Sequence, residues 1–480
     1  MKKICPRLIT GVALLISVTS CMAVSKTFFM PRSLIGNSVF ELAQSNYDIY
    51  HNSLRDTDRP VVNLYGSAIF QQSRHSSDLA SYFFPGNQES ISFTEDGSGD
   101  VDSLWFNLIS EAGTYYESVL TMSPKRRMYA GYITTHVDLC RIMNGLWFSF
   151  DIVPMHVEHK LNLDEVPSDH PGIIAGFTTT EEALNNSSWW QYGRFSNGKV
   201  SKTRIDDIQV KLGHDHFFCD NKYRVGGYLV TTIPTGNRPE SVYVFEPIVG
   251  SKHWSLGLGL TGDWMIFKND KHSLNFMVDG KYRYVFKGTE RRSFDLTNGE
   301  WSRYLQVALQ TEPWNSTPAI NLLTHSVKVH PRSVVDVWSA LHYTWCNWNL
   351  EVGYDFWWRQ KEEIHGNFDY ITTSSEAIFD IGGVCTNPIS CSSATIAEAL
   401  VGEHVVVSDV DFTPLTAADV NVSSAEHPRA LSNTIFANIS RNGTLRCHPT
   451  TIGIGGLYEF AHDRNALEQF AVWLKMGIDF

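Results

Sequence analysis

The chain has 480 residues and a net charge of −12 at pH 7, and 12% of its residues are aromatic. The negative charge argues against nucleic acid as a partner, because a surface that binds phosphates should be basic. Beyond the N-terminus, no apolar run reaches the roughly eighteen residues of a membrane-spanning helix. A mean hydropathy of −0.18 is still compatible with a β-barrel, because half of each barrel strand faces a polar interior.

Residues 1–23 are predicted to be an export signal. Three basic residues precede the apolar run Leu8–Val18, which is too short to serve as a membrane anchor. Ordinary cleavage after Ala23 is favoured. The stretch Val18–Cys21 also resembles a lipoprotein processing box, which would leave Cys21 acylated, but a barrel does not need that anchor. Residues 24–60 are predicted to form a periplasmic arm or a plug, and residues 61–480 an outer-membrane barrel.

The central part of the chain repeats the alternation of apolar and polar residues that is typical of β-strands. The clearest hairpins are 254–286, with its turn at Asn269-Asp270-Lys271, and 335–358, with its turn at Cys346-Asn347. Weaker strands are predicted at 129–139, 146–156, 205–217, 223–233, 301–309, 323–329, 431–439 and 451–460.

The last fourteen residues alternate with almost no error. Phe470, Val472, Leu474, Met476, Ile478 and Phe480 occupy one set of positions, and mostly small or polar residues occupy the other. A soluble amphipathic strand could show the same pattern. A terminal aromatic residue on an alternating strand resembles the assembly signal of outer-membrane barrels, which implies contact with the barrel-assembly machinery through Phe480.

The length of the strands and the position of the aromatic residues favour a membrane barrel over a soluble β-sandwich. Strands in soluble sheets are usually about 5–6 residues long, whereas the clear strands here run for twelve or more. Trp254, Trp345 and Trp348 lie at strand ends, where the two membrane interfaces favour amphipathic rings. We therefore predict an all-β fold: a transmembrane antiparallel up-and-down barrel of about 14–16 strands.

Short and long connections alternate from residue 128 onwards. Outer-membrane barrels keep short turns in the periplasm and long loops outside, so the connections predict the orientation. The longest connection, 362–429, is predicted to be extracellular.

Charged residues recur on the predicted inner face of the strands. In a barrel too wide to be filled by side chains, such residues line a hydrated lumen and set ion preference, although they could also pair and only rigidify the wall. The lumen-lining candidates are Asp207, Lys211, Asp263, Asp279, Lys281, Arg283, Asp336, Glu351, Asp355, Arg359, Glu459 and Lys475. Glu290-Arg291-Arg292 could fold inwards as a cationic constriction, but a solvated loop edge is the more frequent outcome.

The eight cysteines fall into three groups. Cys5 and Cys21 belong to the signal. Cys385 and Cys391 lie in the longest loop, where a disulfide is plausible in an exported protein. Cys140, Cys219, Cys346 and Cys447 fall at predicted periplasmic turns, where two disulfides with undetermined pairing, a metal site or free thiols remain open alternatives.

The sequence contains no hydrolase elbow, phosphate loop or HExxH motif. A phospholipase would need Ser and His on one face, but Ser339 and His342 face opposite ways on a strand. His156 and Glu158 would share one face of a strand, but His159 would face the other, so the three do not form a ligand set. We therefore expect no enzyme activity, no cofactor and no metal.

The stretch Ile233-Pro234-Thr235-Gly236, followed by Phe245 to Gly250 and the strand from Trp254, resembles the long-chain fatty acid and aromatic hydrocarbon channels of bacterial outer membranes. This resemblance covers about thirty residues and implies a diffusion channel of about fourteen strands for apolar solutes. Those channels carry an N-terminal hatch, and no hatch motif is found between Ser25 and Pro60.

We expect an outer-membrane channel of a Gram-negative-type bacterium that admits small solutes by passive diffusion and contacts outer-membrane lipid. The first alternative is a transporter of hydrophobic compounds such as fatty acids. The second is a surface, adhesion or structural protein whose barrel supports the loop 362–429. The oligomeric state does not follow from the sequence.

Overall fold

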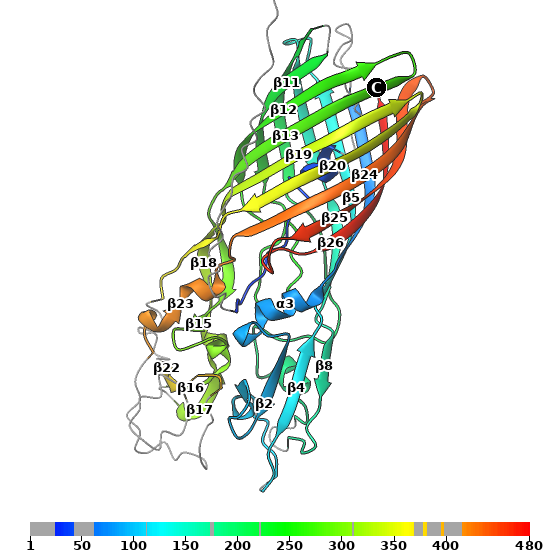
Figure 1. The fold of residues 1–480 in the computed structure, drawn as a ribbon. Coiled ribbons are helices and arrows are strands. Elements are labelled where there is room, and N and C mark those ends of the chain that lie inside the picture. The colour runs from blue at the N-terminus through cyan, green and yellow to red at the C-terminus, as the bar shows by residue number, and fades with distance from the viewer. Residues whose placement is uncertain are drawn as a thin grey trace, which may run out of the picture.

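The structure is a computed structural model that describes residues 25–42, 62–111, 113–172, 177–219, 222–309, 312–368, 378–381, 395–397 and 415–480. Antiparallel strands close into a tilted barrel, and the long connections at one end fold into a separate lobe (Figure 1). The prediction of a transmembrane antiparallel β-barrel is confirmed.

The barrel strands follow one another around the wall in chain order. β1 pairs with both β26 and β5, which closes the ring. β6 and β7 are parts of one strand interrupted at Val153, and β9 and β10 are parts of another interrupted at Asp206 and Asp207. The strands are β1 (Val62–Ser73), β5 (Lys125–Asp138), β6 (Leu146–Ile152), β7 (Pro154–Lys160), β9 (Val200–Ile205), β10 (Ile208–Phe218), β11 (Tyr223–Ile233), β12 (Ser255–Lys268), β13 (His272–Val285), β19 (Arg332–Trp345), β20 (Trp348–Arg359), β24 (Ala430–Leu445), β25 (His448–Ala461) and β26 (Gln469–Asp479).

The ring has twelve strands when each interrupted strand is counted once, so the expected 14–16 is too high. Two of the predicted strands, 301–309 and 323–329, belong to the lobe, where they contribute β16 (Gln306–Leu309) and β18 (Thr324–His330). Their alternation is that of any half-buried strand, and periodicity alone does not distinguish a lipid-facing strand from a lobe strand.

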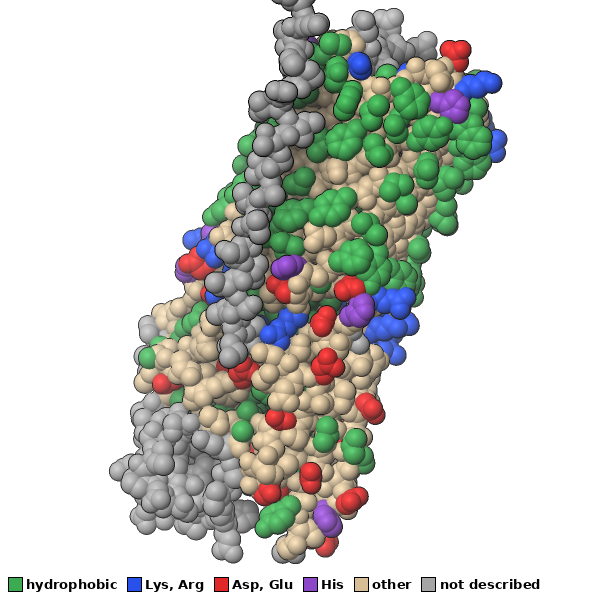
Figure 2. Space-filling view, in the orientation of Figure 1, with side chains coloured by type: hydrophobic (Ala, Val, Ile, Leu, Met, Phe, Trp, Pro, Cys, Tyr) green, Lys and Arg blue, Asp and Glu red, His purple; other side chains and the backbone are tan. Residues whose placement is uncertain are grey.

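The outer surface of the barrel is apolar. On β12, Leu256, Leu258 and Leu260 point outwards and are more than half exposed, whereas the intervening residues point inwards and are buried. The same alternation continues on β26 with Val472, Leu474 and Met476. Hydrophobic side chains cover the barrel in Figure 2, and charged side chains gather near its two ends. This belt matches the lipid-facing band of an outer-membrane barrel.

The two ends of the barrel differ in their connections. Short turns join β5 to β6, β10 to β11, β12 to β13, β19 to β20 and β24 to β25, and both Val62 and Phe480 lie at this same end, where their backbones exchange hydrogen bonds. The long connections all lie at the opposite end. Because short turns mark the periplasmic rim of outer-membrane barrels, the lobe is extracellular.

The lobe is built from the long connections. Among the described residues, its helices are α3 (Ser76–Phe83), α4 (Thr180–Asn185) and α5 (Ala319–Leu323), with 3₁₀ turns at Pro85–Asn87, Ser103–Phe106, Ser302–Tyr304, Ala417–Asp419 and Val422–Ala425. Its remaining strands are β2 (Ser90–Thr94), β3 (Val101–Asp102), β4 (Glu117–Met122), β8 (Leu163–Val166), β14 (Gly288–Ser293), β15 (Asp295–Leu296), β17 (Glu312–Pro318), β21 (Glu363–His365), β22 (Ile378–Ile381) and β23 (Val420–Asn421). None of the helices in the described part of the chain is long and apolar enough to cross a membrane.

The lobe has an aromatic core of its own. Trp105, Trp190, Trp301 and Tyr304 are almost fully buried there, and the indole of Trp301 donates a hydrogen bond of 2.7 Å to the carbonyl oxygen of Phe83. Burying one large apolar side chain contributes about 1.5–3 kcal/mol, so a cluster of this size is enough to hold short elements together. The described parts of the long connections therefore form a packed cap and not a set of independent loops.

Candidate functional site

The inward-facing residues of the barrel are mostly polar. Eleven of the twelve lumen-lining candidates are buried, and Arg283 is half-buried. Four large rings lie along the wall and not across the lumen, because each covers a glycine on a neighbouring strand. A Cβ at Gly213, Gly259, Gly353 or Gly455 would lie 2.0–2.4 Å from the ring of Trp147, Tyr228, Phe436 or Trp473, respectively.

The N-terminal segment, residues 25–42, runs from the lobe into the lumen. At its start, the backbone nitrogen of Lys26 donates to the carbonyl oxygen of Tyr82, and that of Thr27 donates to Ser424. Further along, Ser33 and Ile35 donate to the carboxylate of Asp206 at the break between β9 and β10. The segment ends with the short helix α1 (Ser38–Leu42) inside the barrel (Figure 1).

Arg32 attaches this segment to one side of the wall. Its guanidinium lies 2.6 Å from Asp336, 2.9 Å from Asp355 and 3.5 Å from Glu459, and all four side chains are nearly fully buried. Three of the predicted lumen-lining carboxylates therefore converge on one cation from the N-terminal segment.

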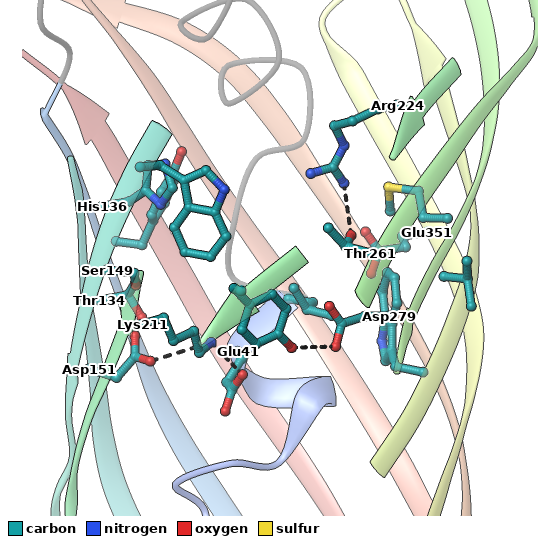
Figure 3. A pocket seen from close by; sticks show the side chains of 17 residues that line it. Glu41, Thr134, His136, Ser149, Asp151, Lys211, Arg224, Thr261, Asp279 and Glu351 are labelled. Carbon is teal, nitrogen blue, oxygen red and sulfur yellow. Dashed lines mark hydrogen bonds and ion pairs between the residues drawn. The ribbon is translucent and has the colours of Figure 1, made fainter. Parts of the chain in front are cut away.

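Glu41 attaches the segment to two other strands of the wall, to β10 (Figure 3) and to β13. Its carboxylate lies 2.6 Å from the Nζ atom of Lys211 and 3.0 Å from that of Lys281. Lys211 also lies 3.6 Å from Asp151, and Gln209 donates to both Glu41 and Asp151. Removing one partner of a buried ion pair typically costs about 3–5 kcal/mol, so the position of α1 in the lumen depends on both partners of these pairs.

A close approach between Arg283 and Gly36 explains why the bend before α1 uses glycine. Gly36 has a φ of +78°, and a Cβ at this position would lie 2.3 Å from the Arg283 guanidinium. Arg283 therefore reaches the N-terminal segment from β13, and a side chain at position 36 would displace it.

Two cavities lie on either side of this segment. The one towards the periplasm has a volume of about 110 Å³ and is lined by Glu41, Lys211, Asp279 and Trp338, among others (Figure 3). The one towards the lobe has a volume of about 70 Å³ and is lined in part by Arg32, Gly36, Arg283 and Arg359. The N-terminal segment contributes lining residues to both cavities, so it lies between them.

The remaining candidates have varied surroundings. Glu351 accepts a hydrogen bond from Asn438 and lies 3.4 Å from His342, while Asp279 accepts one from Tyr228. Asp263 and Lys475 are buried in the periplasmic half of the wall.

Asp207 lines the cavity towards the lobe and also makes contacts that hold a connection in place. It accepts hydrogen bonds from Gly236 and Ser251 and so anchors the connection between β11 and β12. Arg32, Glu41, Asp151 and Asp206 are site residues that strand periodicity did not indicate.

A buried charge cluster joins the barrel mouth to the lobe. Arg292 lies 2.6 Å from Glu290 and 3.2 Å from Glu362, and His253 lies 2.5 Å from Glu290. Glu290 and Arg292 thus turn inwards, whereas Arg291 is exposed. Burial opposes the charged form of Glu290, but Arg292 and His253 outweigh it and lower the pKa of Glu290 to about 2. Burial also opposes charging of His253, yet Glu290 raises the pKa of this histidine.

The junction of His253, Glu290 and Arg292 is expected to be most stable between pH 4.5 and 6.5, the ordinary pKa values of glutamate and histidine. The stabilisation from Glu290 is complete above 4.5 and is lost as the pH falls towards 2. That from His253 is complete below 6.5 and is lost as the pH rises through its raised pKa. Protease digestion of the lobe at pH values below, within and above this window would measure the stability of the junction. A His253→Gln variant that still lost stability at alkaline pH would contradict the role given to His253.

The cysteines of the short turns offer a way to test the orientation of the barrel in the membrane. Cys140, Cys219, Cys346 and Cys447 are free thiols at the periplasmic end, and the last three are exposed. Cys5, Cys21, Cys385 and Cys391 lie outside the described residues, as do the predicted signal and its cleavage site. Phe480 directly follows β26, and its role in assembly remains a prediction.

In a Cys385→Ser, Cys391→Ser background, a large membrane-impermeant maleimide should leave intact cells unlabelled. It should label the protein once the outer membrane has been permeabilised, because the thiols then become accessible from the periplasm. Labelling of Cys346 or Cys447 on intact cells would show that the short turns face the cell exterior and that the barrel has the opposite orientation.

No family model matches the chain, and no curated protein matches it either. Among solved structures, it is similar to an outer membrane channel from Pseudomonas putida F1, with 10% identity and a TM-score of 0.41 over 89% of this chain and 98% of the other. It is also similar to a Pseudomonas aeruginosa FadL homologue (7%, TM-score 0.30, 88% and 90% covered) and to the Pseudomonas putida toluene transporter TodX (8%, TM-score 0.32, 95% and 94% covered). The strand pairing described above, and not these low similarities, carries the assignment as a barrel.

Proposed function

We propose that this protein is an outer-membrane channel for the passive diffusion of small hydrophilic solutes, with the N-terminal segment acting as its plug. The observation that carries the proposal is a polar lumen divided into two cavities by residues 25–42. Side chains alone fill barrels of about eight strands, whereas barrels of 16–18 strands leave an open channel. A barrel of twelve strands is wide enough to hold a chain segment. Once that segment moves away, the same space can admit a solute.

The contacts of the plug support displacement more than permanent sealing. A permanent seal would be most stable with an apolar interface, because replacing buried ion pairs by packed apolar residues is often neutral or stabilising. Here the segment is held by charges on Arg32 and Glu41, whose wall partners would be hydrated once the lumen opened. Polar walls of this kind suit small hydrophilic solutes.

Osmotic swelling of liposomes that contain the purified chain tests the proposal. The swelling rate in sugars of increasing size should fall with solute size, and it should rise when the plug contacts are removed. If neither the native chain nor a folded plug variant admits any sugar or ion, the proposal is wrong.

A second candidate function is the transport of hydrophobic compounds, and one observation favours it. The lipid-facing wall has a depression of about 670 Å³ near the break at Val153, lined mainly by apolar side chains that include Phe70, Tyr129 and Leu474. An apolar solute would partition into such a depression from the membrane. Uptake of a labelled fatty acid that does not change when the plug contacts are removed would favour this function over the first.

A further inference from the structure

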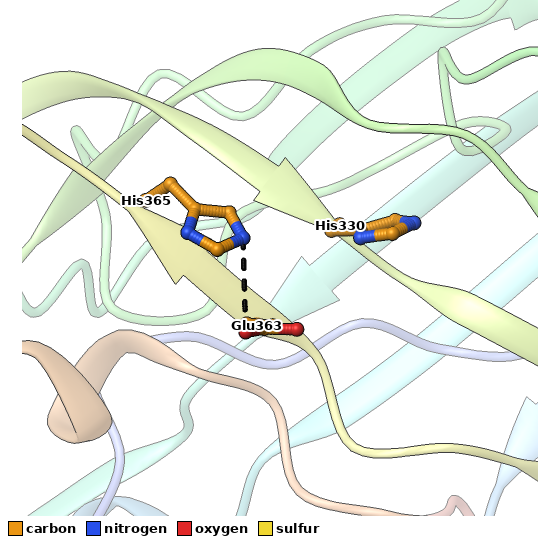
Figure 4. A group of neighbouring side chains, drawn as sticks. All are labelled: His330, Glu363 and His365. Carbon is orange, nitrogen blue, oxygen red and sulfur yellow. Dashed lines mark ion pairs between the residues drawn. The ribbon is translucent and has the colours of Figure 1, made fainter.

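Three side chains of the kind that bind metal ions gather outside the barrel, at its extracellular end. His330 ends β18, and Glu363 and His365 lie on β21 (Figure 4). Their ligand atoms all lie within 4.8 Å of one another. These residues belong to the sheet formed by β14, β18 and β21, so they are separate from the lumen.

The backbone pairing explains why the three side chains meet. His330 is paired directly with Glu363 across the two strands. His365 lies two residues further along β21, so it shares a face with Glu363, while Ile364 points to the opposite face and is buried in the lobe core. Two strands therefore present two imidazoles and one carboxylate on the same side of the sheet.

The surrounding cations orient the carboxylate. Arg332 lies 3.3 Å from one oxygen of Glu363 and donates to the carbonyl oxygen of Lys361, which leaves the other carboxylate oxygen 3.8 Å from the Nε2 atom of His365. Lys328 is paired with His365, and its ammonium donates a 2.6 Å hydrogen bond to Thr289 on β14. This hydrogen bond holds the positive charge of Lys328 near β14.

We propose that His330, Glu363 and His365 bind a divalent transition-metal ion, with Zn²⁺ as the preferred ion. Two imidazoles and one carboxylate are a common zinc ligand set, and a water molecule would complete the tetrahedral coordination. The ion would tie β18 to the first residues of the long connection 362–429. It would thereby fix the base of that connection to the barrel mouth.

Titration of the purified full chain with Co²⁺, followed by Zn²⁺, tests this site. The chain should carry no polyhistidine tag and should first be treated with a chelator. We expect one Co²⁺ per chain with a visible absorption band typical of four-coordinate cobalt, and displacement of that ion by Zn²⁺. His330→Ala and His365→Ala should each weaken Zn²⁺ binding by at least about tenfold, which corresponds to 1.4 kcal/mol.

His75→Ala is the matched control, because His75 forms an exposed pair with Glu468 at 2.7 Å. This variant should bind one Zn²⁺ with the native affinity. All three histidines are partly or fully exposed, so the variants are expected to fold, which the heat-dependent gel mobility of the barrel would verify. Absence of stoichiometric binding, or equal affinity in the native chain, His330→Ala and His365→Ala, would overturn the proposal.

Discussion

Replacing Arg32 and Glu41 together by glutamine is expected to raise the ion conductance of the reconstituted channel by about two orders of magnitude. While the plug is in place, the double variant removes the positive charge beside Asp336 and Asp355 and the negative charge beside Lys211 and Lys281. Loss of one partner of a buried pair costs about 3–5 kcal/mol, and each 1.4 kcal/mol changes a population tenfold. In the open state, water would solvate the same wall charges, so the variant favours opening. Planar-bilayer recordings measure the change.

Two further variants make this result specific. Arg32→Lys keeps the positive charge and should preserve most of the closed population. Lys199→Gln breaks an ion pair with Glu158 on the outside of the barrel, at 2.7 Å, and should leave the conductance unchanged. A double variant that folds, as judged by heat-dependent gel mobility, and conducts no better than the native chain would show that residues 25–42 do not act as a plug.

The sequence predicted the barrel wall well because the alternation of apolar and polar residues in each strand has a local physical cause. A strand with lipid on one side and a polar lumen on the other must alternate, and the hairpins at 254–286 and 335–358 do so over their whole length. The same alternation also predicted which charges point inwards, including Lys211, Asp336 and Glu351. The strand number was overestimated because the extracellular lobe contains strands of its own.

The plug contacts could not be predicted, because they depend on which residues meet and not on any period. Arg32 and Glu41 lie in a segment without strand alternation, and their partners come from positions up to about 430 residues away in the chain. The sequence did contain one signal. Arg32 and Glu41 are isolated charges among many apolar residues, and the predicted inner face of the barrel carries charges of both signs that could pair with them. The sequence alone left the arm and the plug as equal alternatives.

The lobe was missed for a different reason. Long connections in outer-membrane barrels are expected to be loops, each considered by itself. The core instead combines Trp105, Trp190 and Trp301 from three connections. The high aromatic content of these connections was the signal, because exposed loops do not need so many large rings. The extracellular lobe therefore also offers a large folded surface above the barrel mouth.

Replacing Arg292 by methionine should unfold the contact between the lobe and the barrel without opening the barrel wall. Arg292 is fully buried, and its loss removes the guanidinium that bridges the carboxylates of Glu290 and Glu362. The expected loss of stability is about 3–5 kcal/mol, of the order of half the stability of a typical domain. Trypsin added to intact cells should then cleave within residues 286–330, for example after Arg303, whose side chain is buried in the native lobe.

The exposed neighbour Arg291 supplies the matched control for this prediction. Arg291→Met removes the same charge from the same strand but breaks no buried ion pair, so its cleavage pattern should match that of the native protein. The barrel of both variants should keep its heat-dependent gel mobility, because strand pairing from β1 to β26 does not involve Arg292. Equal protease resistance of the two variants would mean that the charge cluster does not hold the lobe on the barrel. Lobe and barrel would then be joined mainly by the packing of Phe29 and its aromatic neighbours Tyr82 and Phe245.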